Sequence, residues 1–481
     1  MRALTFLLAI CPAVAAVWAP LWSGEGPSSQ ALLWFSGAAV LGTFLLPQLH
    51  TGETRAEAMR RVAIESAFDP FAYAAVATLG LLVVPLYNVA LCPGCDAAAI
   101  AAGANPLPPF RWLPFCVNTT EHESVLCWFA TAFATAFALR RALVLKWKRV
   151  AFETIVWNSA ALSVYGFAKL ISAGAGPDHS FAVFGYANHG GAFFELSLAL
   201  AYGLWGSRIT AKSQESEEAT PSAHPILSRH YPVFAVALCL FGCIATLCRA
   251  AMLFAVAFSM IFFAYIFVAS MSGRRQVHRV KGLSGVLILI AVVLSVMIYA
   301  PPEVADEFMT LTTRGVADRA SGKGQYHERV AAAMMRDFPL FGVGGWGYRH
   351  FCQSYMTKKE KIGLQSVGGA NVHNDYLQFS AEHGIVGFAL IAAVFLLLSR
   401  SVWRGWAATY EHFRFARTER TPVSPQAVYA VDPAVFFAVV GVLAILLHAL
   451  GDCPLRSPPV LTVLFASLAS VPGYFDLRLI Q

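Results

Sequence analysis

The sequence predicts an all-α integral membrane protein with about twelve transmembrane helices. Of its 481 residues, 57% are hydrophobic and 13% are charged, whereas soluble domains carry about 25% charged residues. The apolar residues form long, nearly uncharged runs, which indicates that lipid surrounds most of the chain. A formal net charge of +7 would suit a nucleic-acid-binding protein, but in a membrane protein basic residues first report topology. The expected partner is therefore membrane lipid and not nucleic acid.

Each nearly uncharged run of about 17 residues or more is long enough to cross the hydrocarbon core as a helix. Helices 1–9 are expected within residues 1–300 and helices 10–12 within residues 377–481, with a hydrophilic segment, residues 301–376, between them. The expected spans are residues 3–22, 31–48, 70–91, 123–139, 150–173, 190–207, 231–247, 250–270, 282–300, 377–399, 433–449 and 459–474. The first run could also be a cleaved signal peptide, but its length and the span directly after it favour a retained helix.

The basic residues orient these helices. With the N-terminus in the cytoplasm, most of the 35 Lys and Arg residues lie on the inner side, as the positive-inside rule requires. A second group lies in the long exterior segment, and only Arg111, Lys169, Arg249 and Arg456 lie elsewhere. Both termini are therefore predicted to be cytoplasmic, and residues 301–376 form the one large exterior segment.

Four cysteines, Cys92, Cys95, Cys116 and Cys127, lie in or beside one exterior connection. Oxidising conditions there would permit two disulfides, whose pairing the sequence leaves open. A zinc site is less favoured, because Cys92-Pro-Gly-Cys95 has no second pair of the same spacing.

The exterior segment carries a predicted short helix, Tyr326–Arg336, followed by Pro339 and the glycine-rich run Gly342–Gly347. Glycines permit the backbone to approach either a ligand or another element closely. The run lacks the Lys-Ser/Thr ending of a phosphate-binding loop, so nucleotide hydrolysis is disfavoured.

His373 lies where the exterior segment re-enters the membrane, so its imidazole can meet a substrate from water or from lipid. An imidazole titrates near neutral pH and can accept a hydroxyl proton, which suits a general base. The alternative interpretation is an interfacial histidine that caps a helix, with Gly384 and Gly387 serving helix packing.

Several blocks of the sequence resemble the bacterial O-antigen ligase and O-antigen polymerase superfamily. The similar blocks are Cys248-Arg-Ala-Ala-Met252, Asp337-Phe-Pro-Leu-Phe-Gly-Val-Gly344, His373-Asn-x9-Gly-x-x-Gly387, Tyr186-Ala-Asn-His-Gly-Gly-Ala192 and His448-x3-Asp-Cys-Pro-Leu-Arg456. They extend over about residues 180–460. The resemblance implies a GT-C-like fold in the bacterial inner membrane, with one large periplasmic loop between helices 9 and 10 that contributes to the active site.

The resemblance also implies a glycosyltransferase that transfers or polymerises an undecaprenyl-pyrophosphate-linked glycan at the periplasmic face, as in lipopolysaccharide biosynthesis. The mechanism would invert the anomeric carbon and need neither metal nor cofactor. His373 would then activate the acceptor hydroxyl. Arg249 would bind the pyrophosphate, for which the forked guanidinium is well suited; the alternative is an arginine that extends to the membrane interface. The second cation would be one of three candidates, since this sequence departs here from the family pattern: Arg319, Lys323 or Arg329.

Three acceptors stay open: lipid A core, another glycan repeat unit, or a protein side chain, as in a protein O-oligosaccharyltransferase. Alternatives from other classes are a twelve-helix transporter or flippase and a non-catalytic scaffold. A transporter would be expected to show inverted repeats and charges near the middle of the membrane. In this sequence the two halves show no convincing pairing, and the charges outside the cytoplasmic clusters gather at the exterior face.

Overall fold

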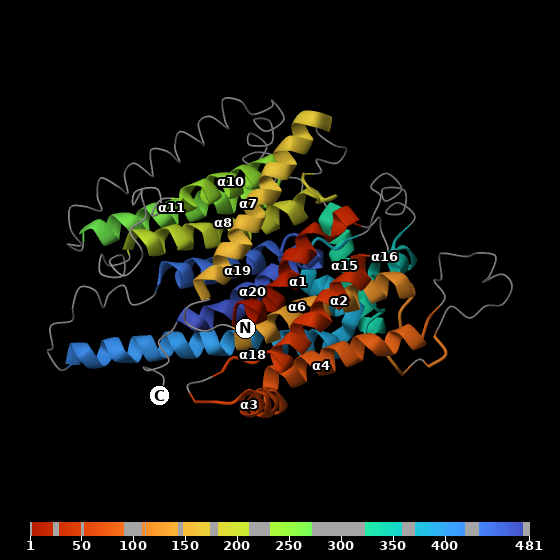
Figure 1. Ribbon diagram of the computed structural model, residues 1–481. Helices are drawn as coiled ribbons and strands as arrows, with labels where there is room; N and C mark the ends of the chain where they lie inside the picture. Colours follow the sequence, from red (N-terminus) through yellow and green to blue (C-terminus); the bar gives the residue numbers. More distant parts are fainter. Residues whose placement is uncertain are drawn as a thin grey trace. The chain divides into compact units, whose positions relative to one another are not determined.

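The protein is all-helical in the computed structural model (Figure 1), which confirms the predicted fold class at that level. The residues that the structure describes are 2–22, 28–49, 52–90, 108–110, 112–142, 148–173, 181–210, 231–271, 323–357, 371–418 and 432–474. Within these ranges there are two isolated β-bridges and no β-strand. The chain divides into two compact units. The first comprises Met1–Ala142, Thr312–Ser399 and Leu447–Phe465, and the second Leu143–Leu311, Arg400–Leu446 and Ala466–Gln481.

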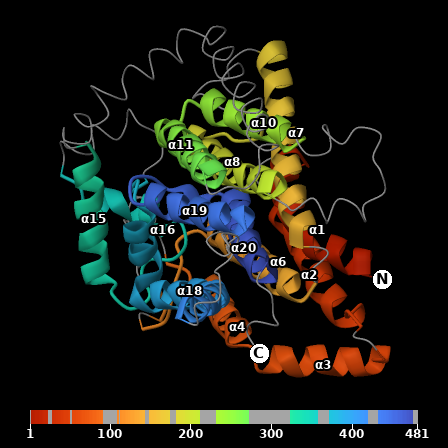
Figure 2. The same ribbon diagram turned by 90° about the vertical axis from the view of Figure 1, so that its left-hand side faces the viewer.

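The first unit is built on α1, α2 and α6, which pack against one another, and α4 packs against α6. Helix α3 runs across the direction of α4, as the views in Figures 1 and 2 show. The helices and short 3-10 turns of this unit are α1 (Arg2–Trp22), α2 (Ser28–Leu45), α3 (Arg55–Ala67), α4 (Pro70–Val83), η1 (Val84–Tyr87), α6 (Thr119–Ala142), α15 (Lys323–Asp337), α16 (Gly347–Phe351), η4 (Cys352–Tyr355), the first part of α18 (Asp375–Thr418) and η6 (Pro454–Arg456).

Local chemistry explains where α3 and α4 begin. Thr54 and Glu57 form a capping box, in which each side chain accepts a hydrogen bond from the other residue's backbone N–H. Asp69 accepts from the N–H of Phe71, and Pro70 occupies the first helical position, where its missing N–H costs nothing. These caps separate two helices that follow each other directly in the chain.

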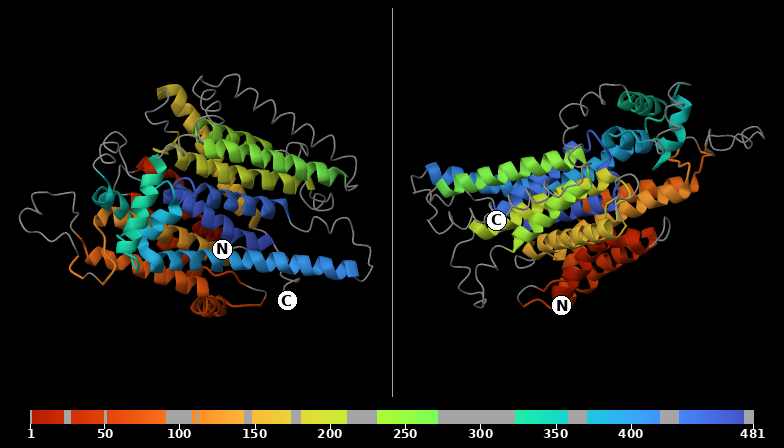
Figure 3. Two further views of the ribbon diagram at one scale, coloured as in Figure 1. Left: turned by 180° about the vertical axis from the view of Figure 1, so that it is seen from behind. Right: turned by 90° about the horizontal axis from the view of Figure 1, so that it is seen from above.

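In the second unit, α8 packs against α7, α10 and α11, and α8, α10 and α11 run side by side in both panels of Figure 3. Small residues permit these close contacts: a Cβ added to Gly191 of α8 would lie 3.1 Å from the Cβ of Ala251 in α11. The elements of this unit are α7 (Lys148–Ala173), α8 (Ala187–Thr210), α10 (Pro232–Ala245), α11 (Arg249–Met271), the second part of α18, most of α19 (Pro433–His448) and η7 (Val471–Tyr474); α20 (Pro458–Ser470) passes from the first unit into the second.

Every predicted membrane span except residues 282–300 coincides with an observed helix, and those residues lie outside the described ranges. By length and composition, five described helices could cross a membrane: Ala3–Leu21, Pro70–Tyr87, Thr119–Ala142, Arg249–Phe267 and Asp375–Ala407. The apolar helices therefore support a membrane protein. The number of twelve spans and the GT-C arrangement remain predictions.

The disulfide prediction is wrong for the two cysteines that the structure describes. Cys116 and Cys127 are buried free thiols. The Sγ of Cys116 donates to the carbonyl of Pro85, 3.1 Å away, and burial raises the pKa of its thiol to about 11. Cys92 and Cys95 lie outside the described residues.

Candidate functional site

The described part of residues 301–376, the predicted exterior segment, folds around a small apolar core of the first unit. Helix α15 confirms the predicted short helix and buries Val330 and Met334 in this core, while α16 contributes Tyr348 and Phe351. Val372, the residue before His373, is part of the same cluster. Apolar packing therefore joins α15, α16 and the start of α18, the elements that surround His373.

The glycine-rich run packs against the backbone of another element, α18. The N–H groups of Val343 and Gly344 donate to the carbonyls of Ala381 and Glu382, at 3.2 and 2.8 Å. In return, the N–H groups of two α18 residues donate to the carbonyls of Pro339 and Leu340. This ladder fixes the run against a kink in α18.

Two glycines make that contact possible. Gly342 has φ +66° and Gly384 has φ +62° with ψ −172°, backbone conformations that side chains rarely permit. A Cβ on Gly342 would lie 2.3 Å from the carbonyl carbon of Glu382, and a Cβ on Gly384 would lie 2.3 Å from that of Leu340. The Asp-x-Pro-Leu and Gly-x-x-Gly blocks therefore pack against each other, backbone to backbone.

His373 occupies a left-handed turn, with φ +53°. Such a conformation costs a non-glycine residue about 1–2 kcal/mol and persists only where neighbours hold it. The N–H of Val372 donates to Oε1 of Gln378 at 2.9 Å, and the N–H of Asp375 donates to the carbonyl of Ala449 at 2.9 Å. The helix cap is supplied by Asn374, whose Oδ1 accepts from the N–H of Leu377. His373 itself is thus not the capping residue.

The imidazole of His373 faces a buried carboxylate. Its Nδ1 lies 3.2 Å from Oδ1 of Asp452, whose side chain is 8% exposed, while the His373 side chain is 49% exposed. Burial alone would raise the pKa of Asp452, but the hydrogen bond and charge of His373, the charge of His448 and the N–H of Cys453 together lower it to about 2. Because an ionised carboxylate can only accept, this contact requires a hydrogen on Nδ1, and in the neutral imidazole with that tautomer Nε2 carries the lone pair.

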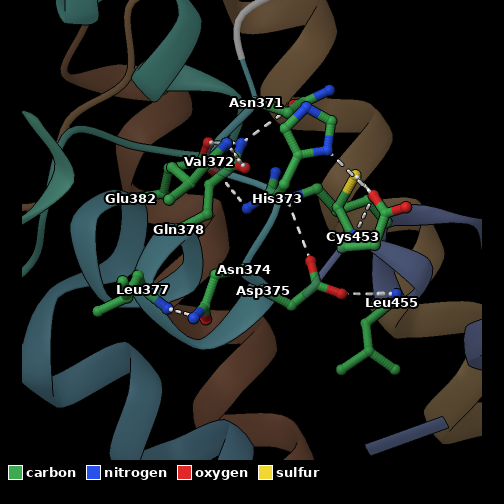
Figure 4. Close-up of polar contacts among 12 residues, drawn as sticks. Asn371, Val372, His373, Asn374, Asp375, Leu377, Gln378, Glu382, Cys453 and Leu455 are labelled. Atoms are coloured by element: carbon green, nitrogen blue, oxygen red, sulfur yellow. Dashed lines mark hydrogen bonds and ion pairs between the residues drawn. The ribbon is translucent and has the colours of Figure 1, made fainter. Parts of the chain in front are cut away.

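A buried ionic network adjoins the His373 turn, and Figure 4 shows its members Asp375, Gln378 and Glu382. Nη2 of Arg456 lies 2.9 Å from Oε2 of Glu382, and its Nε lies 3.5 Å from Oδ1 of Asp375. Gln378 connects the network to the His373 turn, because its Nε2 donates to Oε1 of Glu382 at 3.1 Å. Asp375 also accepts from the N–H of Leu455 at 2.8 Å. The segments that carry His373 and Asp452 are therefore joined by buried charges as well as by backbone hydrogen bonds.

The predicted loop cations differ in what the structure describes. Arg319 lies outside the described residues, and Lys323 begins α15, although its side chain is also outside them. Arg329 is exposed on α15, and its Nη1 donates to the carbonyl of Tyr355 at 3.5 Å. Of the three candidates, Arg329 is the one whose side chain is described, and its helix packs on the same core as Val372.

Arg249 belongs to the second unit, where it is half-buried at the first position of α11. It follows a tight turn in which Leu247 has φ +52°. Gly191 of α8 packs directly beside this turn, since an added Cβ would lie 2.3 Å from the Cβ of Cys248. The blocks Tyr186–Ala192 and Cys248–Met252 are thus in contact, which gives Arg249 a fixed environment within its own unit.

The sequence interpretation assigned no role to Asp452, Gln378, Glu382 or Arg456. Two signals pointed to them. Arg456 lies outside both the predicted cytoplasmic clusters and the predicted exterior segment. Burying an arginine among apolar helices costs free energy unless the charge is paired. Asp375, Gln378 and Glu382 follow each other at intervals of three and four residues, which places them on one face of α18. Contact between that face and Arg456 was not evident from the linear sequence.

Residues 234–392 match the family model described as O-antigen ligase, a range that includes Arg249, the loop cations and His373. Among curated proteins, no sequence matches the chain significantly.

Proposed function

We propose that the chain transfers or polymerises an undecaprenyl-pyrophosphate-linked glycan, and the match of residues 234–392 to the family model described as O-antigen ligase supports this proposal. The proposed site is the periplasmic face of the bacterial inner membrane, with both termini in the cytoplasm. The reaction is a glycosyl transfer that inverts the anomeric carbon and requires no metal or cofactor. The observation that carries the proposal is the pair formed by half-exposed His373 and buried, ionised Asp452.

In the proposed reaction, Nε2 of His373 accepts the proton of an acceptor hydroxyl. The hydroxyl oxygen attacks the anomeric carbon from the side opposite the pyrophosphate, and the bond from that carbon to the phosphate oxygen breaks. The bonding electrons leave with the pyrophosphate. Asp452 supports this step because it orients the imidazole through Nδ1 and stabilises the imidazolium that forms.

Cations stabilise the pyrophosphate as its charge develops. Arg249 is the first such group in the proposal, and its charge and forked geometry match phosphate oxygens. The second is one of Arg319, Lys323 and Arg329. Arg329 has support from the structure, since it is an exposed guanidinium on a helix that packs with Val372 on one core.

The test is glycan transfer by the purified protein in lipid discs, supplied with a lipid-pyrophosphate-linked glycan. His373→Ala is expected to lower kcat by about a hundredfold or more, as the loss of a general base does. His350→Ala is the matched control, because His350 lies in the same unit and contacts Glu121 at 2.7 Å. Wild-type transfer by folded His373→Ala would refute the mechanism. Movement of the lipid-linked glycan across the membrane without a new glycosidic bond would identify a transporter.

Asp452→Asn separates the charge of Asp452 from its hydrogen bond to the imidazole. The amide can hold Nδ1 but carries no charge for the imidazolium, so kcat is expected to fall by about 10²–10⁴. In a plot of kcat against pH, the fall in activity on the acid side should persist in the variant. The reason is that the pKa of Asp452 is lowered to about 2, so its carboxylate does not titrate near neutral pH. Disappearance of that limb would assign it to Asp452 instead.

The acceptor is decided by deleting the gene and comparing three products. Loss of glycan on lipopolysaccharide alone would indicate lipid A core as the acceptor. Loss of long polymer alone would indicate another repeat unit, and loss of glycoprotein alone would indicate a protein side chain.

A further inference from the structure

The residues around Asp452 also form a set of metal ligands. Nδ1 of His373, Oδ1 of Asp452 and Sγ of Cys453 all lie within 4.8 Å of one another. The nitrogen is 3.2 Å and the sulfur 3.4 Å from Oδ1. Zinc bonds of ~2.0 Å to nitrogen or oxygen and ~2.3 Å to sulfur give tetrahedral ligand separations of roughly 3.3–3.6 Å. The two separations from Oδ1 of Asp452 are therefore close to those that a zinc ion would impose, and the nitrogen and the sulfur lie within 4.8 Å of each other.

The surroundings favour a cation of this kind. Asp452 and Cys453 are adjacent and buried, whereas the side chain of His373 is half exposed, which leaves an open side for a water ligand. A coordinating thiol loses its proton to the metal, so Cys453 would bind the ion as a thiolate.

We propose that His373, Asp452 and Cys453 bind Zn²⁺ and that the bound ion inhibits glycan transfer. The inhibitory half rests on the proposed function, whereas the binding half does not. One imidazole, one carboxylate and one thiolate select a borderline-soft ion such as Zn²⁺ or Co²⁺ over Mg²⁺ or Ca²⁺, which take oxygen ligands.

Inhibition follows from the proton balance. On binding, the thiol of Cys453 releases one proton to water, and Nδ1 of His373 gives up its hydrogen and coordinates the metal. The neutral imidazole then carries its hydrogen on Nε2. An imidazole in this state cannot accept a hydroxyl proton at Nε2, and its hydrogen bond to Asp452 is lost.

Binding is tested with Co²⁺ as a spectroscopic substitute for zinc, on the full-length protein in lipid discs. A sulfur-to-cobalt charge-transfer band is expected in the wild type, and added Zn²⁺ but not Mg²⁺ should abolish it. Cys453→Ser should remove the band. Cys352→Ser should retain it, because Cys352 is a buried thiol of the same unit that contacts the carbonyl of Arg349. Absence of the band from the wild type, or its retention in Cys453→Ser, would overturn the proposed site.

Inhibition is measured as the ratio of transfer rates with a chelator and with micromolar Zn²⁺, each variant being compared with itself. The wild type and Cys352→Ser should lose at least about tenfold in rate, and Cys453→Ser should lose much less. A cobalt band accompanied by full transfer activity in zinc would overturn the inhibitory role. Binding in a protein that transfers no glycan would instead refute the proposed function and leave the metal site established.

Discussion

The two units hold their candidate residues by different means. In the first, His373 is fixed by a strained turn, a buried carboxylate and the charges of Arg456 and Glu382. In the second, Arg249 begins a helix that packs closely on α8 through Gly191. The first environment depends on several polar groups that must be satisfied together, and the second depends on the shapes of small residues. Single substitutions should therefore have different consequences in the two units.

The largest effect is expected for Arg456→Met. Arg456 is 3% exposed and lies against two fully buried acids, Asp375 and Glu382. Removing one partner of a buried ion pair leaves uncompensated charge and typically costs about 3–5 kcal/mol. Chemical or thermal unfolding in detergent should show this loss. The control is Arg336→Met on the exposed face of α15, which should change stability by less than about 0.5 kcal/mol. Equal stability of the two variants would show that the buried network does not stabilise the unit.

Two glycine substitutions compare the units directly. Gly384→Ala combines a backbone conformation that is almost restricted to glycine with a 2.3 Å clash against Leu340, so a loss of about 2–4 kcal/mol is expected. Gly191→Ala introduces a clash with Cys248 but no backbone strain, which should cost about 1–3 kcal/mol. A double variant, Gly191→Ala with Cys248→Ala, should recover part of the second loss. No comparable rescue is expected for Gly384→Ala, because its neighbour is backbone.

The sequence predicted the parts of the molecule that depend on local composition. Uncharged runs locate the helices because the bilayer core demands a minimum apolar length, and the family-like blocks made His373 a candidate, which stays a prediction. Asp452 could not be assigned because it lies 79 residues from His373, and only the contact between the start of α18 and the segment after α19 brings them together. The glycine-rich run was compatible with a ligand or with another element, and only the structure shows its partner to be the kink at Gly384. The disulfide prediction failed for Cys116 and Cys127 because the spacing of cysteines in the sequence does not reveal which thiols are buried and unpaired in the fold.

Gln378→Leu is expected to change activity more clearly than stability. The substitution preserves most of the volume but removes the acceptor for the N–H of Val372 and the donor to Glu382 and Asn371. Each lost hydrogen bond in such a place costs about 1 kcal/mol, so the unit should lose about 2–3 kcal/mol and stay folded. The left-handed turn at His373 would then lose a contact that holds it, and kcat should fall by about tenfold or more while KM for the donor changes little. Gln353→Leu, on an exposed position of η4, is the control. A stability loss without any change in kcat would show that Gln378 supports the fold alone and that other contacts position His373.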